Sequence, residues 1–286
     1  MFRKRELLYI HLAVLLFGFS GLFAEWVTLS ALLIVFGRVI FASFFLLVVL
    51  VTKNEKVLLQ SKRQVGPFLL LGALLALHWW SFFHAIQLST VAVGLITFAT
   101  FPIFASFLEP IVFKEPFQRK NIIFAILTFI GILIIVSEFH IGSDVTYGAL
   151  WGIVSACTFA CLSIANRKFV VNTSSIQIGF YQNLFAAICL SPLLFNTSNL
   201  MSIEYVDILL LILLGIVFTG CAHVLYIQGL SKINVRTASI IVTLEPVYGI
   251  VAAMMFLKQF PVLREWIGIT LIIAVVMYVS WKKGMS

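Results

Sequence analysis

The sequence predicts an all-α polytopic membrane protein with ten transmembrane helices, and three observations support this fold class. Of the 286 residues, 62% are hydrophobic and only 10% are charged, whereas an average soluble domain carries about 25% charged residues. The apolar residues are gathered in runs long enough to cross a hydrocarbon core of about 30 Å as helices. Within these runs, as in "FLLLGALLAL" (68–77), apolar residues follow one another without the alternation typical of a transmembrane β-barrel.

Ten segments are predicted to span the membrane, the fifth of them short. They are residues 7–24, 30–51, 66–86, 90–113, 122–137, 147–169, 175–195, 206–230, 236–257 and 264–281. The first follows a basic end and is similar to a signal peptide. No small-x-small cleavage site follows it, however, and nine further spans do. We therefore interpret it as the first transmembrane helix.

Basic residues are distributed unevenly between alternate loops. With the N-terminus in the cytoplasm, 16 of the 19 Lys and Arg residues fall in cytoplasmic segments. This positive-inside bias predicts that both termini are cytoplasmic and that the protein is a multi-pass protein of the cell (inner or plasma) membrane. The net charge of +8 is then a topological signal, and we expect the lipid bilayer rather than nucleic acid as a partner. No oligomeric state is assigned.

The two halves of the sequence are related by an offset of 144 residues. This offset places "FGRVIFASFFLL" (36–47) on "FYQNLFAAICLS" (180–191), and it also places Pro102 on Pro246. Each half holds five spans, so the second half enters the membrane from the opposite side. Inverted repeats are typical of secondary transporters, whose sites lie where the repeats meet. We divide the chain into residues 1–143, the first five-helix repeat, and 144–286, the second and inverted repeat.

On these features the chain resembles the EamA-type branch of the drug/metabolite transporter superfamily over essentially its whole length. The resemblance rests on the two inverted sets of five spans, on "FGRVIFAS" in span two, and on two further motifs, "FPIFASFLEPIVFKEPF" (101–117) and "LEPVYGIVAAMMFLK" (244–258). The sequence departs from the family at Lys258-Gln259, where a small residue and a glutamate are usual, and at Phe17-Gly18, where Trp-Gly is common. The resemblance implies export or facilitated movement of small metabolites, often amino acids or their relatives, across the inner membrane.

Two charged residues are predicted near the middle of spans. Arg38 lies eight residues into span two, about 12 Å from its outer end, where a charge needs a partner or a watery cavity. A guanidinium binds carboxylates through two parallel hydrogen bonds, so Arg38 is a candidate substrate-binding residue. The alternative is a structural ion pair. For Glu245 in span nine three roles stay open: a proton carrier, a ligand for a substrate amine, or the partner of Arg38.

Prolines and a second glutamate indicate moving parts. Pro102 and Pro246 each remove a backbone hydrogen bond and are predicted hinges, with Pro246 loosening span nine next to Glu245. Glu109 in span four lies close to the cytoplasmic end. We expect it to act in gating or to pair with basic loop residues rather than to bind substrate.

Span three contributes aromatic candidates in "LHWWSFFHAI" (77–86). Helical spacing places Trp80 and His84 on one face, and we expect this face to line the cavity, where an aromatic ring next to a titratable group suits an amine. His78 and Trp79 are expected to point elsewhere. The alternative for both tryptophans is lipid or packing contact.

The second repeat supplies the remaining candidates. The offset of 144 residues places Gln182 opposite Arg38. An offset of 142, which aligns "LS" (88–89) with "LS" (230–231), places Tyr226 opposite His84, so both are predicted to line the same cavity. No metal and no cofactor is expected, because the neighbouring Cys157 and Cys161 lack further ligands.

The sequence therefore predicts a carrier that works by alternating access and moves a small molecule, an amino acid or a related zwitterion or amine. Export is favoured by the resemblance, and protons are the expected coupling ion. Uptake of a quaternary amine is the alternative. An intramembrane enzyme is a third class, but the catalytic patterns HExxH and Gly-x-Ser-x-Gly do not occur in the sequence, so we expect a non-enzyme.

Overall fold

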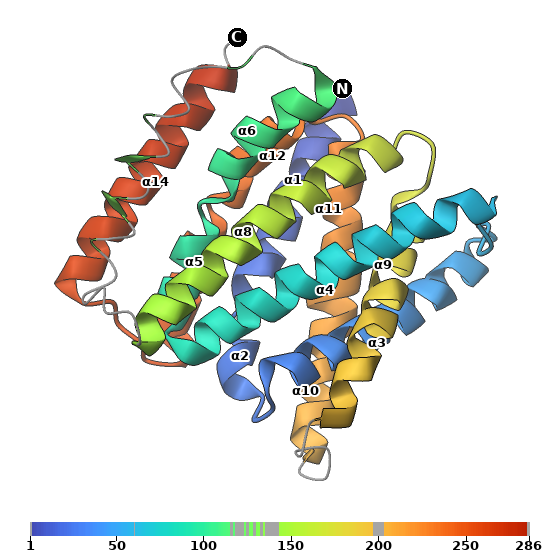
Figure 1. Ribbon diagram of the computed structural model, residues 1–286, viewed down its shortest axis with the longest axis horizontal. Helices are drawn as coiled ribbons and strands as arrows, with labels where there is room; N and C mark the ends of the chain where they lie inside the picture. Colours follow the sequence, from blue (N-terminus) through green and yellow to red (C-terminus); the bar gives the residue numbers. More distant parts are fainter. Residues whose placement is uncertain are drawn as a thin grey trace.

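The computed structural model describes residues 2–59, 61–114, 143–196 and 203–284, together with residues 117, 123, 126, 127, 130, 131 and 134. Figure 1 shows a bundle of tilted helices with both chain termini at the same end. We call this end the termini side and the opposite end the far side. The described residues form helices and no strands, which confirms the predicted all-α class.

The described helices follow one another through the bundle in chain order. They are α1 (Phe2–Ser20), α2 (Phe23–Trp26), α3 (Ala31–Thr52), α4 (Val65–Leu88), α5 (Val91–Phe98), α6 (Phe101–Phe113), α8 (Asp144–Phe169), α9 (Ser175–Leu190), α10 (Tyr205–Gly215), α11 (Ala222–Leu230), α12 (Val235–Val242), α13 (Glu245–Phe256) and α14 (Leu263–Gly284). The π-helix η4 (Ile216–Cys221) joins α10 to α11, and the 3₁₀ segments η1 (Lys62–Gln64) and η2 (Ser191–Asn196) flank α4 and α9.

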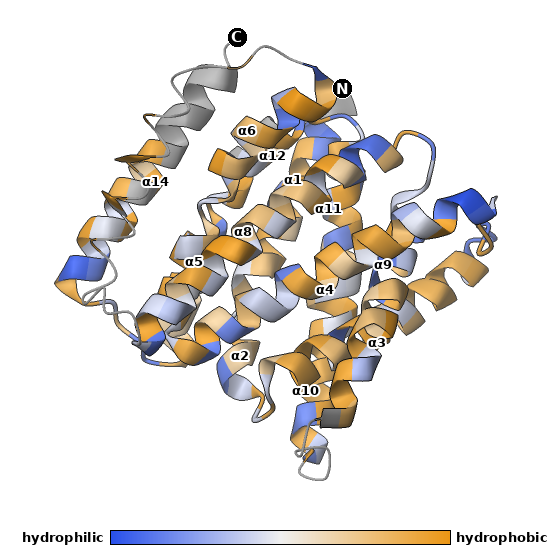
Figure 2. Cartoon of the chain, viewed as in Figure 1, coloured by the Kyte–Doolittle hydropathy of each residue, from blue (hydrophilic) through white to orange (hydrophobic). Residues whose placement is uncertain are grey.

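Seven helical segments among the described residues are long and apolar enough to cross a membrane. They correspond to predicted spans one to four and six to eight. Span nine is present as two shorter helices, α12 and α13, and span ten as α14. Span five, 122–137, lies largely outside the described residues. Hydrophilic residues gather mainly at helix ends (Figure 2), while large apolar side chains such as Phe44, 67% exposed, face outward as a bilayer requires.

Spans four and nine are broken at equivalent positions. α5 ends at Phe98 and α6 begins at Phe101, and α12 ends at Val242 and α13 begins at Glu245. Each bound in the second pair lies 144 residues after its counterpart, the offset found in the sequence. Pro102 and Pro246 are the second residues of α6 and α13, where the missing N–H costs nothing. The sequence predicted a loosened helix at Pro246, and the structure shows a two-residue turn, Thr243-Leu244, between α12 and α13.

The ends of these two broken spans are also built alike. Thr90 caps α5 by accepting a hydrogen bond from the backbone N–H of Val93, and Asn234 accepts one from the N–H of Thr237 at the start of α12. At the other ends, Lys114 and Lys258 both have a left-handed backbone with φ of 55°. These pairs of residues follow the same offset of 144.

Two glycines let helices approach closely where charged residues lie. A Cβ on Gly18 of α1 would lie 2.8 Å from Cβ of Tyr248 and 3.0 Å from the carbonyl oxygen of Glu245. A Cβ on Gly215 would lie 2.8 Å from the carbonyl oxygen of Arg38. Small residues at such crossings are typical of packed membrane helices. They bring the backbones that carry Arg38 and Glu245 into tight contact with α10 and α1.

Candidate functional site

Arg38 of α3 is fully buried in the bundle. Its Nε donates a hydrogen bond to Oγ1 of Thr219 at 2.8 Å, and its Nη2 lies 3.4 Å from the carbonyl oxygen of Phe218. The guanidinium carbon lies 3.4 Å from the centroid of the Trp79 ring and 5.2 Å from that of Phe83. The third nitrogen, Nη1, is buried without a hydrogen-bond partner. The Arg38 guanidinium thus bonds to Thr219 along one edge and packs one face against Trp79, while its Nη1 makes no hydrogen bond.

Thr219 is presented to Arg38 by the π-helix η4. Its hydroxyl donates to the carbonyl oxygen of Leu214 at 2.8 Å, which leaves the oxygen free to accept from Arg38. π-Helical turns inside α-helices occur frequently at functional sites. Thr219 was not among the predicted site residues, although the Thr-Gly pair is a polar interruption of the apolar run "GIVFTGCAHVL" (215–225).

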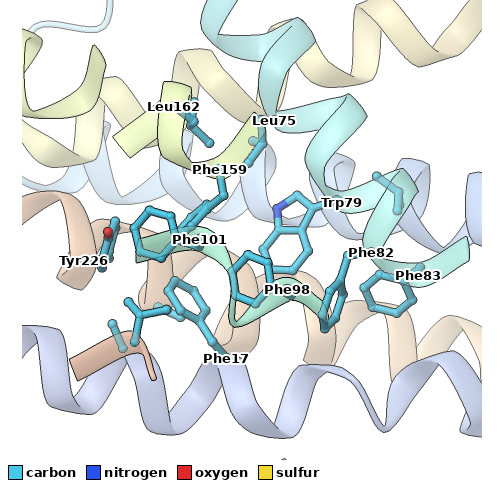
Figure 3. Packing of buried hydrophobic residues seen from close by; sticks show 14 of the residues in the cluster. Phe17, Leu75, Trp79, Phe82, Phe83, Phe98, Phe101, Phe159, Leu162 and Tyr226 are labelled. Atoms are coloured by element: carbon cyan, nitrogen blue, oxygen red, sulfur yellow. The ribbon is translucent and has the colours of Figure 1, made fainter. Parts of the chain in front are cut away.

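Aromatic rings from six helices pack together in the interior (Figure 3), and two of them, Trp79 and Phe83, lie against the Arg38 guanidinium. We call them the central aromatic cluster: Phe17, Trp79, Phe82, Phe83, Phe98, Phe101, Phe159 and Tyr226. The ring centroid of Phe17 lies 6.3 Å from that of Trp79 and 5.9 Å from that of Tyr226. Such rings supply apolar surface and π-faces that attract cations.

His223 of α11 borders the cluster. Its ring lies 5.4 Å from Phe17 and 5.7 Å from Trp79. Both ring nitrogens are buried without a hydrogen-bond partner, although buried polar groups are normally paired. Among the described residues, no group of three or more His, Cys, Asp or Glu side chains is arranged to hold a metal ion.

Glu245 is the first residue of α13 and is buried, with Oε2 unpartnered. A helix N-terminus favours a negative charge. Glu245 and Arg38 are close enough to interact electrostatically. The ion pairs within 4.0 Å among the described residues do not include this pair. Arg38 and Glu245 therefore lie in one buried region without forming a direct ion pair.

Arg38 packs against Trp79 and Phe83 of α4, whereas Trp80 and His84 pack against α8. Their rings stack at 5.1 Å with an interplanar angle of 12°, and Trp80 packs on Trp151 of α8 at 4.8 Å. The residues that reach the interior are Trp79 and His78, which were expected to point elsewhere. His78 Nδ1 lies 2.9 Å from the hydroxyl of Ser155. Apolar residues occur all round α4, so its residue pattern does not reveal which face is inward, and the assignment of Trp80 and His84 to the substrate cavity stays a prediction.

Gln182 and Tyr226 are both fully buried but lie in different settings. Gln182 donates a hydrogen bond from Nε2 to Oδ1 of Asn166, which ties α9 to α8, and its Oε1 is unpartnered. Tyr226 belongs to the central aromatic cluster and donates to the hydroxyl of Ser163 at 3.2 Å. The structure thus places Tyr226 with Phe17 and Trp79, whereas Gln182 is engaged between two helices.

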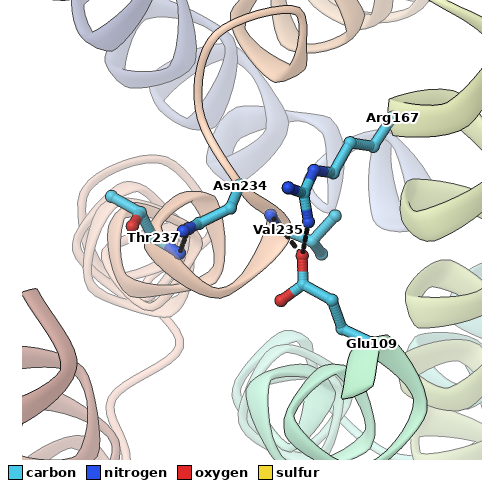
Figure 4. Close-up of polar contacts among 5 residues, drawn as sticks. All are labelled: Glu109, Arg167, Asn234, Val235 and Thr237. Atoms are coloured by element: carbon cyan, nitrogen blue, oxygen red, sulfur yellow. Dashed lines mark hydrogen bonds and ion pairs between the residues drawn. The ribbon is translucent and has the colours of Figure 1, made fainter. Parts of the chain in front are cut away.

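Glu109 lies at the termini side and joins three helices (Figure 4). Its Oε1 accepts a hydrogen bond from Nη1 of Arg167, at the end of α8, at 2.5 Å. The same oxygen accepts one from the backbone N–H of Val235, the first residue of α12, at 3.0 Å. The carboxylate is fully buried. Glu109 therefore connects α6 and α8 to the start of α12, which is the counterpart of α5 in the second repeat.

Comparison with known proteins agrees with this architecture. The family model of the EamA-like transporter family matches residues 4–137 and again residues 146–281. A transporter of Bacillus subtilis (strain 168), YxxF, is 25% identical over 268 residues, which are 92% of this chain and 85% of that protein. An S-adenosylmethionine uptake transporter of Rickettsia bellii (strain RML369-C) is 26% identical over 259 residues, 88% of this chain and 85% of its own.

A solved crystal structure shows the same fold. It matches 99% of this chain and 99% of its own with a TM-score of 0.73 at 18% sequence identity. The resemblance drawn from the sequence motifs is thereby confirmed, and the apolar helices are those of a multi-pass membrane transporter. The chain belongs to the EamA-like transporter family.

Proposed function

We propose that this transporter moves a small zwitterionic metabolite, an amino acid or a relative of one, by alternating access between its two repeats. The observation that carries the proposal is the buried guanidinium of Arg38 with its unpartnered Nη1. Nε is bound to Thr219 and Nη2 has only a long contact to a carbonyl. The edge formed by Nη1 and Nη2 is therefore the one that a substrate carboxylate can bind through two hydrogen bonds.

We assign the binding of the substrate's positive group to the aromatic rings near Arg38. Trp79, Phe17 and Tyr226 offer π-faces in a buried setting, and Glu245 provides a carboxylate with a free oxygen. Ammonium and other organic cations bind to such combinations. The named S-adenosylmethionine transporters among the relatives favour this chemistry, because that compound carries a carboxylate, an ammonium group and a sulfonium group.

The two breaks supply the moving parts of the proposed cycle. Pro102 and Pro246 act as hinges, and Glu109 acts as the gate on the termini side, which is cytoplasmic in this proposal. Glu245 carries a proton between the two states, since an apolar environment favours the neutral form of a carboxyl group. Export is the proposed direction. Uptake is the second candidate, and it is favoured by the relatives that are S-adenosylmethionine uptake transporters.

Thermal denaturation of the purified protein with matched ligands tests the proposed substrate class. The panel contains neutral amino acids, S-adenosylmethionine, and for each compound one analogue that lacks the carboxylate and one that lacks the positive charge. We expect a zwitterion to raise the melting temperature of the wild-type protein and to leave that of Arg38→Lys unchanged. Equal stabilisation by the analogue without a carboxylate would overturn the assignment of Arg38.

A further inference from the structure

Two cavities open on the termini side, one of about 400 Å³ and one of about 500 Å³. The larger one is strongly basic. The larger cavity, of about 500 Å³, is formed by the ends of α6, α8 and α11 and by the connection to α12. Its lining residues are Phe113, Arg167, Lys168, Val171, Asn172, Leu230, Ser231, Lys232, Ile233 and Asn234. The described residues of this lining include three cations and no Asp or Glu. We call it the basic pocket.

Arg167 belongs to the basic pocket and to the Glu109 junction at the same time. Its side chain is 26% exposed, whereas that of Glu109 is fully buried. The guanidinium carbon also lies 4.3 Å from the ring centroid of Phe113. Nη1 of Arg167 is bonded to Glu109, and a guanidinium has five N–H donors. The remaining donors can bind a second anion that enters from the pocket.

We propose that the basic pocket binds a phosphate- or carboxylate-bearing oxyanion, and that this anion shares Arg167 with Glu109 and thereby loosens the junction of α6, α8 and α12. Lys168 and Lys232 are exposed and attract anions, and no carboxylate occurs among the lining residues that the structure describes. A bound anion weakens the pull of Arg167 on Glu109 and repels the Glu109 carboxylate. The inference rests on the proposed gating role of Glu109 and is independent of which substrate is carried.

The backbone N–H of Val235 reports this junction directly. It donates to Glu109 at 3.0 Å and is the first N–H of α12, so its protection from exchange depends on that carboxylate. The test measures hydrogen exchange of the peptide that contains Val235, in the unmodified chain held in phosphatidylcholine nanodiscs. Sodium phosphate is compared with sodium chloride at equal ionic strength. We expect phosphate to speed exchange by about two- to fivefold, the scale of a partly exposed ion pair.

Two double variants locate the effect. Lys168→Gln with Lys232→Gln removes two charges from the basic pocket, and the phosphate effect is expected to disappear. Lys53→Gln with Lys56→Gln removes two exposed charges elsewhere and is expected to keep it. An equal loss in both variants, or an unchanged effect in the first, would overturn the proposal, as would phosphate having no effect on the wild-type protein.

A second measurement separates the sources of the anion. Nanodiscs that contain phosphatidylglycerol replace those of pure phosphatidylcholine, without phosphate in the buffer. Faster exchange that depends on Lys168 and Lys232 in these discs assigns the pocket to a lipid headgroup. An effect of free phosphate alone assigns it to a soluble anion. No transported substrate is present in either arm, so a wrong substrate assignment does not affect the result.

Discussion

The guanidinium of Arg38 stacks on the ring of Trp79, with 3.4 Å between the guanidinium carbon and the ring centroid. A desolvated contact of this kind is worth about 2 kcal/mol. The Arg38 guanidinium therefore occupies the face of Trp79 on which we expect the positive group of a zwitterionic substrate to bind. Substrate binding is therefore expected to turn Arg38 toward the substrate carboxylate and to expose Trp79 to the substrate's positive group.

The first prediction separates the two supports of Arg38. Thr219→Val removes the acceptor for Nε and is expected to cost about 1.5–3 kcal/mol of stability, the value of a hydrogen bond to a charged group. Trp79→Leu removes the stacked face and is expected to weaken substrate binding more than Thr219→Val does. Melting temperatures and ligand-induced shifts of both variants measure this. A Trp79→Leu protein that binds substrate as tightly as the wild type would contradict the assigned cation site.

The second prediction concerns Glu245 as the proton carrier. Replacing it with Gln imitates the protonated carboxyl group permanently. Exchange of labelled for unlabelled substrate needs no net proton movement and should survive in Glu245→Gln, whereas accumulation driven by a pH gradient should be lost. Both are measured in proteoliposomes. Gradient-driven accumulation at the wild-type level in this variant would remove Glu245 from the coupling mechanism.

The third prediction concerns the crossing of α1 and α13. Gly18→Ala places a Cβ 3.0 Å or less from Cβ of Tyr248 and the carbonyl oxygen of Glu245, so the helices must separate where Glu245 begins α13. We expect a cost of about 1–3 kcal/mol and impaired transport. Gly66→Ala is the matched control, because no atom lies within 4 Å of its Cβ position. Equal melting temperatures of the two variants would show that the close approach is not needed.

The fourth prediction concerns orientation in the membrane. Single cysteines that replace the exposed Leu58 and Val171 lie on the termini side, and those that replace Phe195 and Tyr205 lie on the far side. The uneven distribution of basic residues predicts that an impermeant thiol reagent added to intact cells labels only the second pair. Labelling of the cysteine at position 58 or 171 from outside would reverse the proposed topology.

The backbone plan was largely readable from the sequence. Proline is favoured in the first turn of a helix, and Pro102 and Pro246 each follow one of the two breaks. The offset of 144 residues reappears in the helix bounds. The division of the chain at residue 143 stays a prediction.

The inward faces of the helices were harder to predict. In a membrane both the lipid-facing and the buried side of a helix are apolar, so hydropathy could not distinguish Trp79 from Trp80. The burial of Arg38 was expected, but its contact with Thr219 depends on the extra residue in the turn of η4. A π-helical turn rotates the side chains that follow it, and no residue pattern in this segment predicted that turn.

Substrate exchange in proteoliposomes tests directly whether a zwitterionic substrate passes through the buried site at Arg38. Labelled amino acids and S-adenosylmethionine are exchanged against unlabelled compound by the wild-type protein and by Arg38→Lys, which keeps the charge but loses the planar fork. We expect exchange of at least one zwitterion by the wild-type protein and none by folded Arg38→Lys. Exchange by Arg38→Lys at the wild-type rate would contradict it.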